Sequence, residues 1–584
     1  MSSSENQWSE NQCTDRDDSK CGSASYSDRY SDASATWVVS CAILMFFMKA
    51  GFLYVEEAFS KSGANYRRRV VLAKYVDTFA STIGFWLFGY AFSGSTSGFI
   101  VGEQQDYIFW FFRFTFASNT ATIIGGTLVG QQIQLRILSV FVYAFFMSAF
   151  IHPALARWMW AAGRNENLMW SPFRYCNGTR TVERDHNVSF YSNEDLGDFV
   201  FLDFAGSGVV HLCGGMAAFI LQIFHRLEKK VSKGTMNLPC FWLPESRESH
   251  TEQHELQASY GASHPYVSYE ASAYQAQAEE PDDDENRGSF LEWMYPKGGG
   301  DENVESAALG VLILWTTWFG FNAGSTESME GKIAHASVGR IALVMALAAA
   351  SGGLTSTIVS GLVQMYKRDE TFNSNEIANG VLACLVAVTG CCPFIDPPWA
   401  LLIGVLTILF YHLGCYIVYL LKLYDGARVF PVHGVCGFWG VMCVGIFSQN
   451  CLIREVYETL CFCEELSLPS RLKEQGFRFL YQLAGGLFIA VWSAVLCSVL
   501  FLVLWLIPIK YFFYMFGLPW LFKFKNPDRG LIEFKGNLLF THFSEINAPS
   551  GGGDLEIANV GHDHRHGVTI NTRTIDEKAD SSNL

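Results

Sequence analysis

The chain has 584 residues, of which 50% are hydrophobic and only 17% are charged. Soluble globular proteins carry about 25% charged residues, so the composition argues against that class and favours a membrane protein. The net charge is −15 and no basic patch is visible, which excludes nucleic acid as an expected partner. The 16 cysteines show no paired CxxC motifs, so we expect no metal site and no cofactor.

The chain consists of a polar N-terminal tail followed by a series of apolar segments. The first 36 residues are polar and rich in Ser, which predicts a disordered tail, and no cleavable signal peptide is expected. A membrane-spanning helix needs about 20 mostly apolar residues. Eleven segments come close to this, although the eighth is short: Trp37–Phe59, Tyr75–Ser93, Tyr107–Gly130, Leu135–Ala162, Val200–Phe224, Ser306–Ala323, Val338–Tyr366, Ile377–Cys391, Trp399–Leu421, Val432–Ser448 and Phe479–Ile509. The sequence therefore predicts an all-α polytopic membrane domain over residues 37–510.

Two further polar regions interrupt or follow this domain. Residues 231–300 separate the fifth and sixth spans, and we interpret them as a mostly disordered insertion. Residues 511–584 form a polar C-terminal tail. A regulatory role for the insertion is one reading, and a tolerated insertion is the simpler one.

The distribution of basic residues predicts the orientation. The short loops after the second and eighth spans contain no Lys or Arg, whereas basic residues follow the odd-numbered spans: Lys61, Arg67, Arg68, Arg69, Lys74, Arg136, Arg226, Lys229, Lys230, Lys367, Arg368, Lys422, Lys510, Lys523, Lys525 and Arg529. Cytoplasmic loops carry the excess of such residues, so the N-terminus is expected outside and the C-terminus in the cytoplasm. The insertion 231–300 is then cytoplasmic. Two glycosylation sequons, at Asn177 and Asn187, fall in a loop that this orientation places outside.

A short internal repeat carries a histidine in each half. His211 follows a valine and precedes Cys213-Gly214, and His433 follows a valine and precedes Cys436-Gly437. The two spans that contain them are five apart, an odd number, so the halves have opposite orientations. We therefore predict two inverted five-helix repeats plus a final helix, with the transport pathway at their interface.

The two histidines are the best candidates for function. A single histidine on an apolar helix is more often a satisfied core residue. Ionisable residues inside a membrane are costly, however, and two at equivalent positions indicate a pore-lining pair. Histidine can accept and donate a proton near physiological pH, so such a pair could bind a small neutral polar molecule or relay a proton.

Several motifs resemble those of the ammonium transporter family (Amt/Mep/Rh), and they occur in the family's order from about Trp37 to Ile509. They are Asp203–His211 (DFAGSGVVH), Trp318–Ser325 (WFGFNAGS), Ala336–Arg340 (ASVGR), Asn379–Leu382 (NGVL), Pro398–Ala400 (PWA) and Phe430–Gly437 (FPVHGVCG). The resemblance implies an ammonium transporter that conducts ammonia through a hydrophobic pore lined by His211 and His433. It also implies a homotrimer, and together with the sequons it suggests the plasma membrane.

The resemblance further implies roles for five residues. Trp160 and Ser325 would form an outer ammonium site, since an aromatic face attracts a cation and the hydroxyl accepts a hydrogen bond. Phe116 and Phe321 would stack as a gate, and Asp203 would support the site from its helix start. Each has a plainer reading: aromatic packing for the phenylalanines, an interface belt for Trp160, and a helix N-cap for Asp203.

Some positions depart from the family pattern. Lys49 stands in the first span where many relatives have a neutral polar residue. Glu56 is seven residues further on, so the two share a helix face but lie too far apart to pair directly. Before His433, Asp425 keeps one of two usual acidic positions, and Arg428 replaces the other.

Three other functions are compatible with parts of the sequence. A Rhesus-type ammonia channel would use the same pore, although Trp160 and Ser325 favour the Amt branch. An ammonium sensor would signal through its loop and tail, but no signalling domain is visible. A membrane enzyme has no support, because no nucleophile and base or metal-spaced cluster stands out in the spans.

Overall fold

The structure is a computed structural model of the chain. It describes residues 32–59, 64–94, 107–128, 137–160, 199–232, 288–295, 303–329, 331–368, 374–456 and 468–507, with short strands at 134–135, 174–175, 523–526, 530–533 and 540–541. All statements of structure below concern these residues.

The first half of the bundle consists of five helical runs, several of which change pitch along their length. They are α1 (Asp32–Ala58); α2 (Ala64–Gly84) continued by η3 (Phe85–Gly89) and α3 (Tyr90–Phe92); α4 (Tyr107–Ile123) with η5 (Ile124–Leu128); α5 (Ile137–Phe146), η6 (Met147–Ile151) and α6 (His152–Trp160); and η8 (Ser207–Leu212) with α7 (Cys213–Ser232).

The second half repeats this arrangement and ends in a long helix. Its elements are α10 (Phe290–Met294), α11 (Val304–Gly324), α12 (Gly331–Lys367), α13 (Ser374–Thr389), α14 (Pro397–Leu420), η9 (Phe430–Val435) with α15 (Cys436–Phe447), α16 (Asn450–Val456) and α17 (Leu468–Leu506). Three antiparallel pairs of short strands join β1 (Gln134–Leu135) to β6 (Phe540–Thr541), β2 (Arg174–Tyr175) to β3 (Phe199–Val200), and β4 (Lys523–Asn526) to β5 (Gly530–Glu533).

The polytopic helical fold is confirmed, and each of the eleven predicted segments overlaps a helical run. Within the described residues, nine helices are long and apolar enough to cross a membrane. The eighth segment forms α13, a shorter apolar helix of 16 residues. The count of eleven spans therefore stays a prediction. Helix ends differ from the hydropathy boundaries because a helix can continue into polar residues; α17, for example, begins at Leu468 rather than near Phe479.

The outer surface of the bundle is apolar. Leu354 on α12, Leu409 on α14 and Val491 on α17 are each at least 60% exposed. Water would penalise such a surface, whereas lipid or a neighbouring subunit would not. This arrangement supports the assignment to a membrane.

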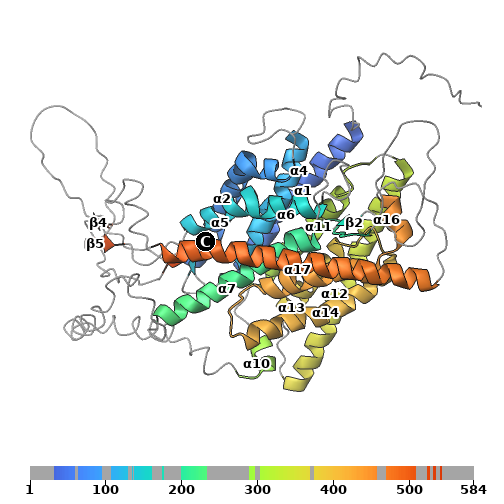
Figure 1. Cartoon of the computed structure of the whole chain (residues 1–584). Helices are drawn as coiled ribbons and strands as arrows, with labels where there is room; N and C mark the ends of the chain where they lie inside the picture. Colours follow the sequence, from blue (N-terminus) through green and yellow to red (C-terminus); the bar gives the residue numbers. More distant parts are fainter. Residues whose placement is uncertain are drawn as a thin grey trace, which may run out of the picture.

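The two halves meet along α1 and α11, the first long helix of each. A side chain on Gly51 of α1 would clash with Leu314, and one on Gly310 of α11 would lie 2.9 Å from the carbonyl oxygen of Gly51. Small residues at this contact let the two backbones approach closely. In Figure 1, α17 runs across the outside of the bundle, and it packs on α5, α6 and α7 of the first half and on α15 of the second.

One part of the predicted disordered insertion 231–300 is structured. α7 continues to Ser232, and residues 288–295 form the short helix α10 and its caps. Ser289 and Glu292 make a capping box at its start. Trp293 packs its ring 4.1 Å from the guanidinium carbon of Arg428. Aromatic packing against the bundle therefore accompanies a short helix near the end of the insertion. Residues 233–287 lie outside the described part of the chain, so the mostly disordered loop stays a prediction.

Candidate functional site

Glycines bring the two histidine-bearing helices together. A Cβ on Gly215 of α7 would lie 2.2 Å from the backbone nitrogen of Gly434 in η9. A Cβ on Gly437 would lie 2.7 Å from the carbonyl oxygen of Ser207, at the start of η8. No side chain fits at such distances, so only glycine allows η8–α7 and η9–α15 to cross this closely. The glycines that follow each histidine thus place His211 beside His433.

Both histidine segments are π-helical, a form often found at functional sites. η8 follows Gly206, whose φ of 109° lies in the left-handed region that favours glycine. η9 contains Pro431, which has no backbone N–H to donate. Gly206 and Pro431 therefore favour the local backbone conformation from which each histidine side chain projects.

The imidazoles of His211 and His433 face each other directly. Their Nδ1 atoms are 3.1 Å apart, the ring centroids are 5.2 Å apart, and the ring planes differ by 17°. One Nδ1 must carry a hydrogen and the other must accept it, so the pair shares a proton. The Nε2 atom of His211 is buried and has no hydrogen-bond partner among the described residues. An unsatisfied ring nitrogen is thus available to a small polar guest.

An aromatic pair stands next to His211. The rings of Phe116 on α4 and Phe321 on α11 have centroids 4.7 Å apart at an angle of 57°. Phe321 is fully buried, and its centroid lies 5.8 Å from that of His211. The two phenylalanines therefore close off the histidines on one side with apolar surface.

Trp160 lies on the far side of this pair. Its ring contacts Phe116 edge to face at a centroid distance of 5.3 Å, and its Nε1 donates to the carbonyl oxygen of Asp203 at 2.7 Å. Ser325 ends α11 one turn after Phe321, and its hydroxyl donates to the Phe321 carbonyl at 3.0 Å. The structure thus joins Trp160 to the phenylalanine pair and places Ser325 at the end of the same helix.

Two aspartates start the histidine segments in the same way. Asp203 Oδ2 accepts hydrogen bonds of 2.9 Å from the backbone N–H groups of Gly208 and Val209. Asp425 accepts from Val429 at 2.9 Å and from Phe430 at 2.8 Å. Each aspartate is eight residues before its histidine. Asp425 is therefore the counterpart of Asp203 in the second half, despite the replacement at Arg428.

Both aspartates are buried, and in the structure they precede the helices Ser207–Val231 and Phe430–Phe447 that are long and apolar enough to cross a membrane. Burial raises the pKa of Asp203 and the pKa of Asp425 to about 6, and the hydrogen bonds from the backbone N–H groups oppose this rise. The N–H donors favour the ionised carboxylate, which is also the form that best complements the positive end of a helix.

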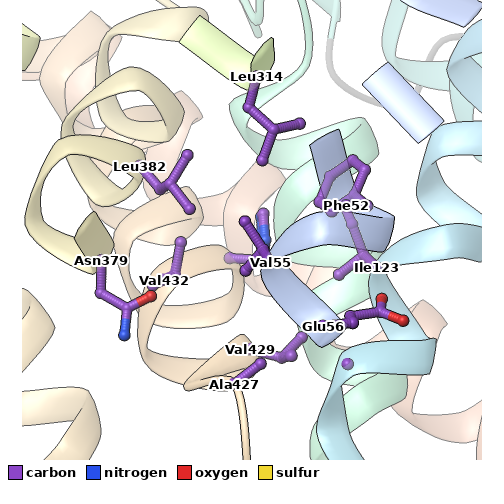
Figure 2. Close-up of a pocket in the computed structure, with 12 residues that line it drawn as sticks. Phe52, Val55, Glu56, Ile123, Leu314, Asn379, Leu382, Ala427, Val429 and Val432 are labelled. Atoms are coloured by element: carbon purple, nitrogen blue, oxygen red, sulfur yellow. The ribbon is translucent and has the colours of Figure 1, made fainter. Parts of the chain in front are cut away.

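A small cavity lies on the other side of the histidines. It has a volume of about 20 Å³, enough for one molecule of the size of water or ammonia. His433 lines it together with apolar side chains such as Phe52 and Leu382. Figure 2 shows Asn379 and Leu382 of α13 on one side and Phe52, Ile123 and Glu56 on the other. We call this space the inner cavity.

These groups form one continuous series of contacts. Trp160 touches Phe116, Phe116 touches Phe321, Phe321 touches His211, and His211 bonds His433, which lines the inner cavity. A cationic guest would meet aromatic faces first and polar nitrogens only after the apolar pair.

Trp318 is a site residue to which the sequence interpretation gave no role. Its ring stacks on His211 with centroids 5.0 Å apart and an angle of 19°, and its Nε1 donates to Thr389 Oγ1 at 2.9 Å. The sequence feature that could have identified Trp318 is its spacing of three residues from Phe321, which puts both side chains on one face of α11. Trp318 thereby fixes the orientation of the His211 ring.

The candidate glycosylation sites, Asn177 and Asn187, lie outside the described residues, so they stay predictions.

Comparisons with known proteins agree on one family. The sequence model described as Ammonium Transporter Family matches residues 36–239 and 287–510. The chain is 28% identical over 428 residues to ammonium transporter Amt2 of Archaeoglobus fulgidus, and the match covers 71% of each chain. It is 25% identical over 447 residues to ammonium transporter 1 member 3 of Solanum lycopersicum, covering 73% of this chain and 77% of that relative.

Solved structures share the fold. Candida albicans Mep2 matches with a TM-score of 0.55 at 18% identity, over 85% of this chain and 87% of that one. A structure described as a sensor Amt protein matches with a TM-score of 0.53 at 24% identity, over 81% of this chain and 93% of that one.

Proposed function

Since the chain belongs to the ammonium transporter family and is an ammonium transporter, we propose that it binds ammonium at Trp160 and passes ammonia along the two histidines. Ammonium loses its proton before the apolar section, and the molecule that crosses that section is neutral. The proton either returns to the water outside or crosses by way of the histidine pair. The following steps give each residue its part.

Trp160 and Ser325 recruit the ion. The face of a tryptophan attracts a cation by about 0.5–2 kcal/mol, depending on how far the site is desolvated. The Ser325 hydroxyl adds an oxygen that accepts a hydrogen bond from ammonium. Potassium has no hydrogen to donate, so it gains nothing from that direction-dependent contact. The Nε1 bond to Asp203 holds the Trp160 ring in place.

Phe116 and Phe321 make the loss of the proton necessary. A bare ion in so apolar a section costs at least several kcal/mol. Neutral ammonia avoids most of that cost, whereas potassium cannot lose its charge. The same barrier thus separates the two ions, and the 4.7 Å contact between the rings excludes water.

His211 and His433 then guide the neutral molecule. Ammonia can donate to an acceptor nitrogen and accept from a ring N–H, and the unpartnered Nε2 of His211 offers one such contact. The shared hydrogen between the Nδ1 atoms also gives the pair a way to pass a proton. If the protein moves the charge of ammonium as well as the ammonia, the proton must take this second route through the histidine pair.

We also propose that the protein is a homotrimer in the plasma membrane, with its N-terminus outside. The orientation rests on the Lys and Arg residues of the short loops, and the trimer on the family resemblance. The exposed apolar faces of α12, α14 and α17 would meet lipid or neighbouring subunits. Asn177 and Asn187 would then be available for glycosylation.

The observation that carries this proposal is the 3.1 Å histidine pair behind a 4.7 Å phenylalanine pair. The test is the ammonium-evoked current of a voltage-clamped cell that expresses the protein, with His211→Ala as the comparison. A saturable inward current that the variant loses supports electrogenic transport. Faster ammonia permeation without current would instead indicate an ammonia channel of the Rhesus type. Neither response, from protein present at the surface, would contradict transport and favour a sensor.

A further inference from the structure

A third buried histidine, without a part in the steps above, lies between elements of the site. His152 begins α6 and is 2% exposed. Its Nδ1 lies 3.0 Å from the hydroxyl oxygen of Thr120 on α4 and 3.3 Å from the carbonyl oxygen of Val209 in η8. Its ring meets that of Trp160 edge to face, with centroids 6.1 Å apart at an angle of 77°. His152 thus joins α6 to both α4 and η8.

The hydrogen-bond partners of His152 fix which ring nitrogen carries a hydrogen. A hydroxyl has one hydrogen to donate, and Thr120 donates that hydrogen to the carbonyl oxygen of Phe116 at 2.9 Å. The Thr120 oxygen can therefore only accept from the imidazole, and the carbonyl oxygen of Val209 is an acceptor in any case. The Nδ1 of His152 must therefore carry a hydrogen, which it shares between these two oxygens.

The π-helical form of η8 permits the second of these contacts. In a regular α-helix the N–H of Cys213 would donate to the carbonyl oxygen of Val209, four residues earlier. Here that N–H donates to the carbonyl oxygens on either side, those of Gly208 and Val210. The Val209 carbonyl is thus without its usual partner and accepts from the imidazole instead. Because Val209 is two residues before His211, this bond holds the backbone that carries the first pore histidine.

A series of hydrogen bonds therefore connects the phenylalanine pair to the histidine pair. The Phe116 carbonyl accepts from Thr120, Thr120 accepts from His152, and His152 also donates to the Val209 carbonyl. All four residues are at most 3% exposed, and a buried acceptor that loses its donor is costly. A satisfied buried histidine would by itself fit a structural role. The two backbones that this one joins, however, carry one ring of each pair, which points to a role in the pathway.

We propose that His152 is a positioning residue that holds α4 against η8 and so keeps the phenylalanine pair closed to potassium. This inference rests on the proposed function, in which the apolar section excludes an ion that cannot lose its charge. Without the Nδ1 donor, the Val209 carbonyl and the Thr120 hydroxyl lose a shared partner, and α4 shifts relative to η8. Phe116 moves with α4, so its 4.7 Å contact with Phe321 loosens and water and cations enter the section.

The test compares two substitutions of the same shape, His152→Asn and His152→Leu. Both side chains branch at Cγ into two atoms, but only asparagine has an N–H donor there, bonded to Cγ as Nδ1 is in histidine. The purified protein is reconstituted into liposomes, and the uptake of radiolabelled methylammonium and of radiolabelled rubidium, which stands in for potassium, is measured side by side. The ratio of the two uptakes does not depend on how much protein is active. We expect H152L to lower the ratio of methylammonium to rubidium uptake about tenfold or more, because two buried acceptors lose their donor, and H152N to stay within about twofold of the wild type.

Equal ratios in H152L and H152N, whether both unchanged or both lowered, would overturn the proposal, because the Nδ1 donor would then not control selectivity. A folded H152L protein that takes up neither ion would reject it as well.

A second pair of variants guards against misfolding of H152L. Thr120→Val keeps the shape of threonine and removes the hydroxyl that links His152 to the Phe116 carbonyl, whereas Thr120→Ser keeps that hydroxyl. T120V should lower the ratio and T120S should not. A wild-type ratio in T120V, or failure of both H152L and T120V to fold, would leave His152 a structural role only and reject the proposal. A wild type that takes up no methylammonium, or takes up rubidium as readily, would reject the proposed function itself and this inference with it.

Discussion

Replacing Gly215 by Ala tests whether the helix crossing sets the geometry of the histidine pair. The added Cβ would lie 2.2 Å from the backbone nitrogen of Gly434 and 2.5 Å from its Cα. Ordinary van der Waals contact begins at 3.4 Å, so the two helices must separate by 1.2 Å (3.4 minus 2.2). Both clashing atoms belong to the backbone, so no side chain can move aside to absorb the strain.

That separation would reach the histidines directly, because His433 precedes Gly434. The Nδ1 to Nδ1 distance would grow from 3.1 Å to about 4.3 Å (3.1 plus 1.2), too long for a hydrogen bond. Overpacking costs about 1–3 kcal/mol and the lost hydrogen bond about 1 kcal/mol, so we expect a loss of about 2–4 kcal/mol. The thermal midpoint of the purified protein in detergent should fall, and ammonium-evoked current should fall at least tenfold.

Gly361→Ala is the matched control. It lies in α12, and no atom comes within 4 Å of a Cβ placed there. Ala favours helix more than Gly by about 1 kcal/mol, so this variant should be as stable as the wild type or more so. A G215A protein with wild-type current and a wild-type thermal midpoint would refute the reasoning, since the glycine crossing would then not control the histidine distance.

Three further predictions follow from the site. Trp160→Leu should raise the half-saturating ammonium concentration about 2- to 30-fold, the range that a cation–π contact of about 0.5–2 kcal/mol implies; Trp158→Leu, whose ring packs on Trp492 instead, should not, and equal effects would count against a recruiting role. Phe321→Ala should open the apolar section and admit a potassium current, measured in ammonium-free solution; a variant that still rejects potassium would argue against the gate. Asp425→Asn leaves one of two backbone N–H groups at the start of η9 without an acceptor and should cost about 1–2 kcal/mol, visible as a lower thermal midpoint; an unchanged midpoint would show that the cap is dispensable.

The sequence was sufficient to predict the helical runs and the histidine pair. Apolar segments near 20 residues long are a strong signal because a membrane tolerates few other structures. His211 and His433 stood out because each precedes a Cys-Gly pair, and the structure shows that glycines near them permit the crossing. The contact between Phe116 and Phe321 followed from the family resemblance rather than from their residue types, since the chain is 15% aromatic.

Partners across helices could not be predicted in the same way. Spacing placed Lys49 and Glu56 on one face of a helix, but periodicity does not say which helix lies opposite. Their partners, Asp77 and Lys74, come from α2 and are fixed only by the packing of α1 on α2. The order of α10 was missed for a related reason, because a five-residue helix has little stability of its own and depends on contacts such as that of Trp293 with Arg428.

The long helix α17 bears on whether the two halves of the bundle move relative to each other during transport. Many transporters expose their site alternately to each side by rocking one repeat against the other. Here a single helix of 39 residues packs on α5, α6 and α7 of the first half and on α15 of the second, across the boundary at which such rocking would occur. We expect this packing to favour one arrangement of the halves, so that in the proposed mechanism the moving parts would be side chains, protons and the substrate itself. If so, the protein would act as a fixed conduit, whose turnover would be set by proton transfer and by the passage of one small molecule at a time.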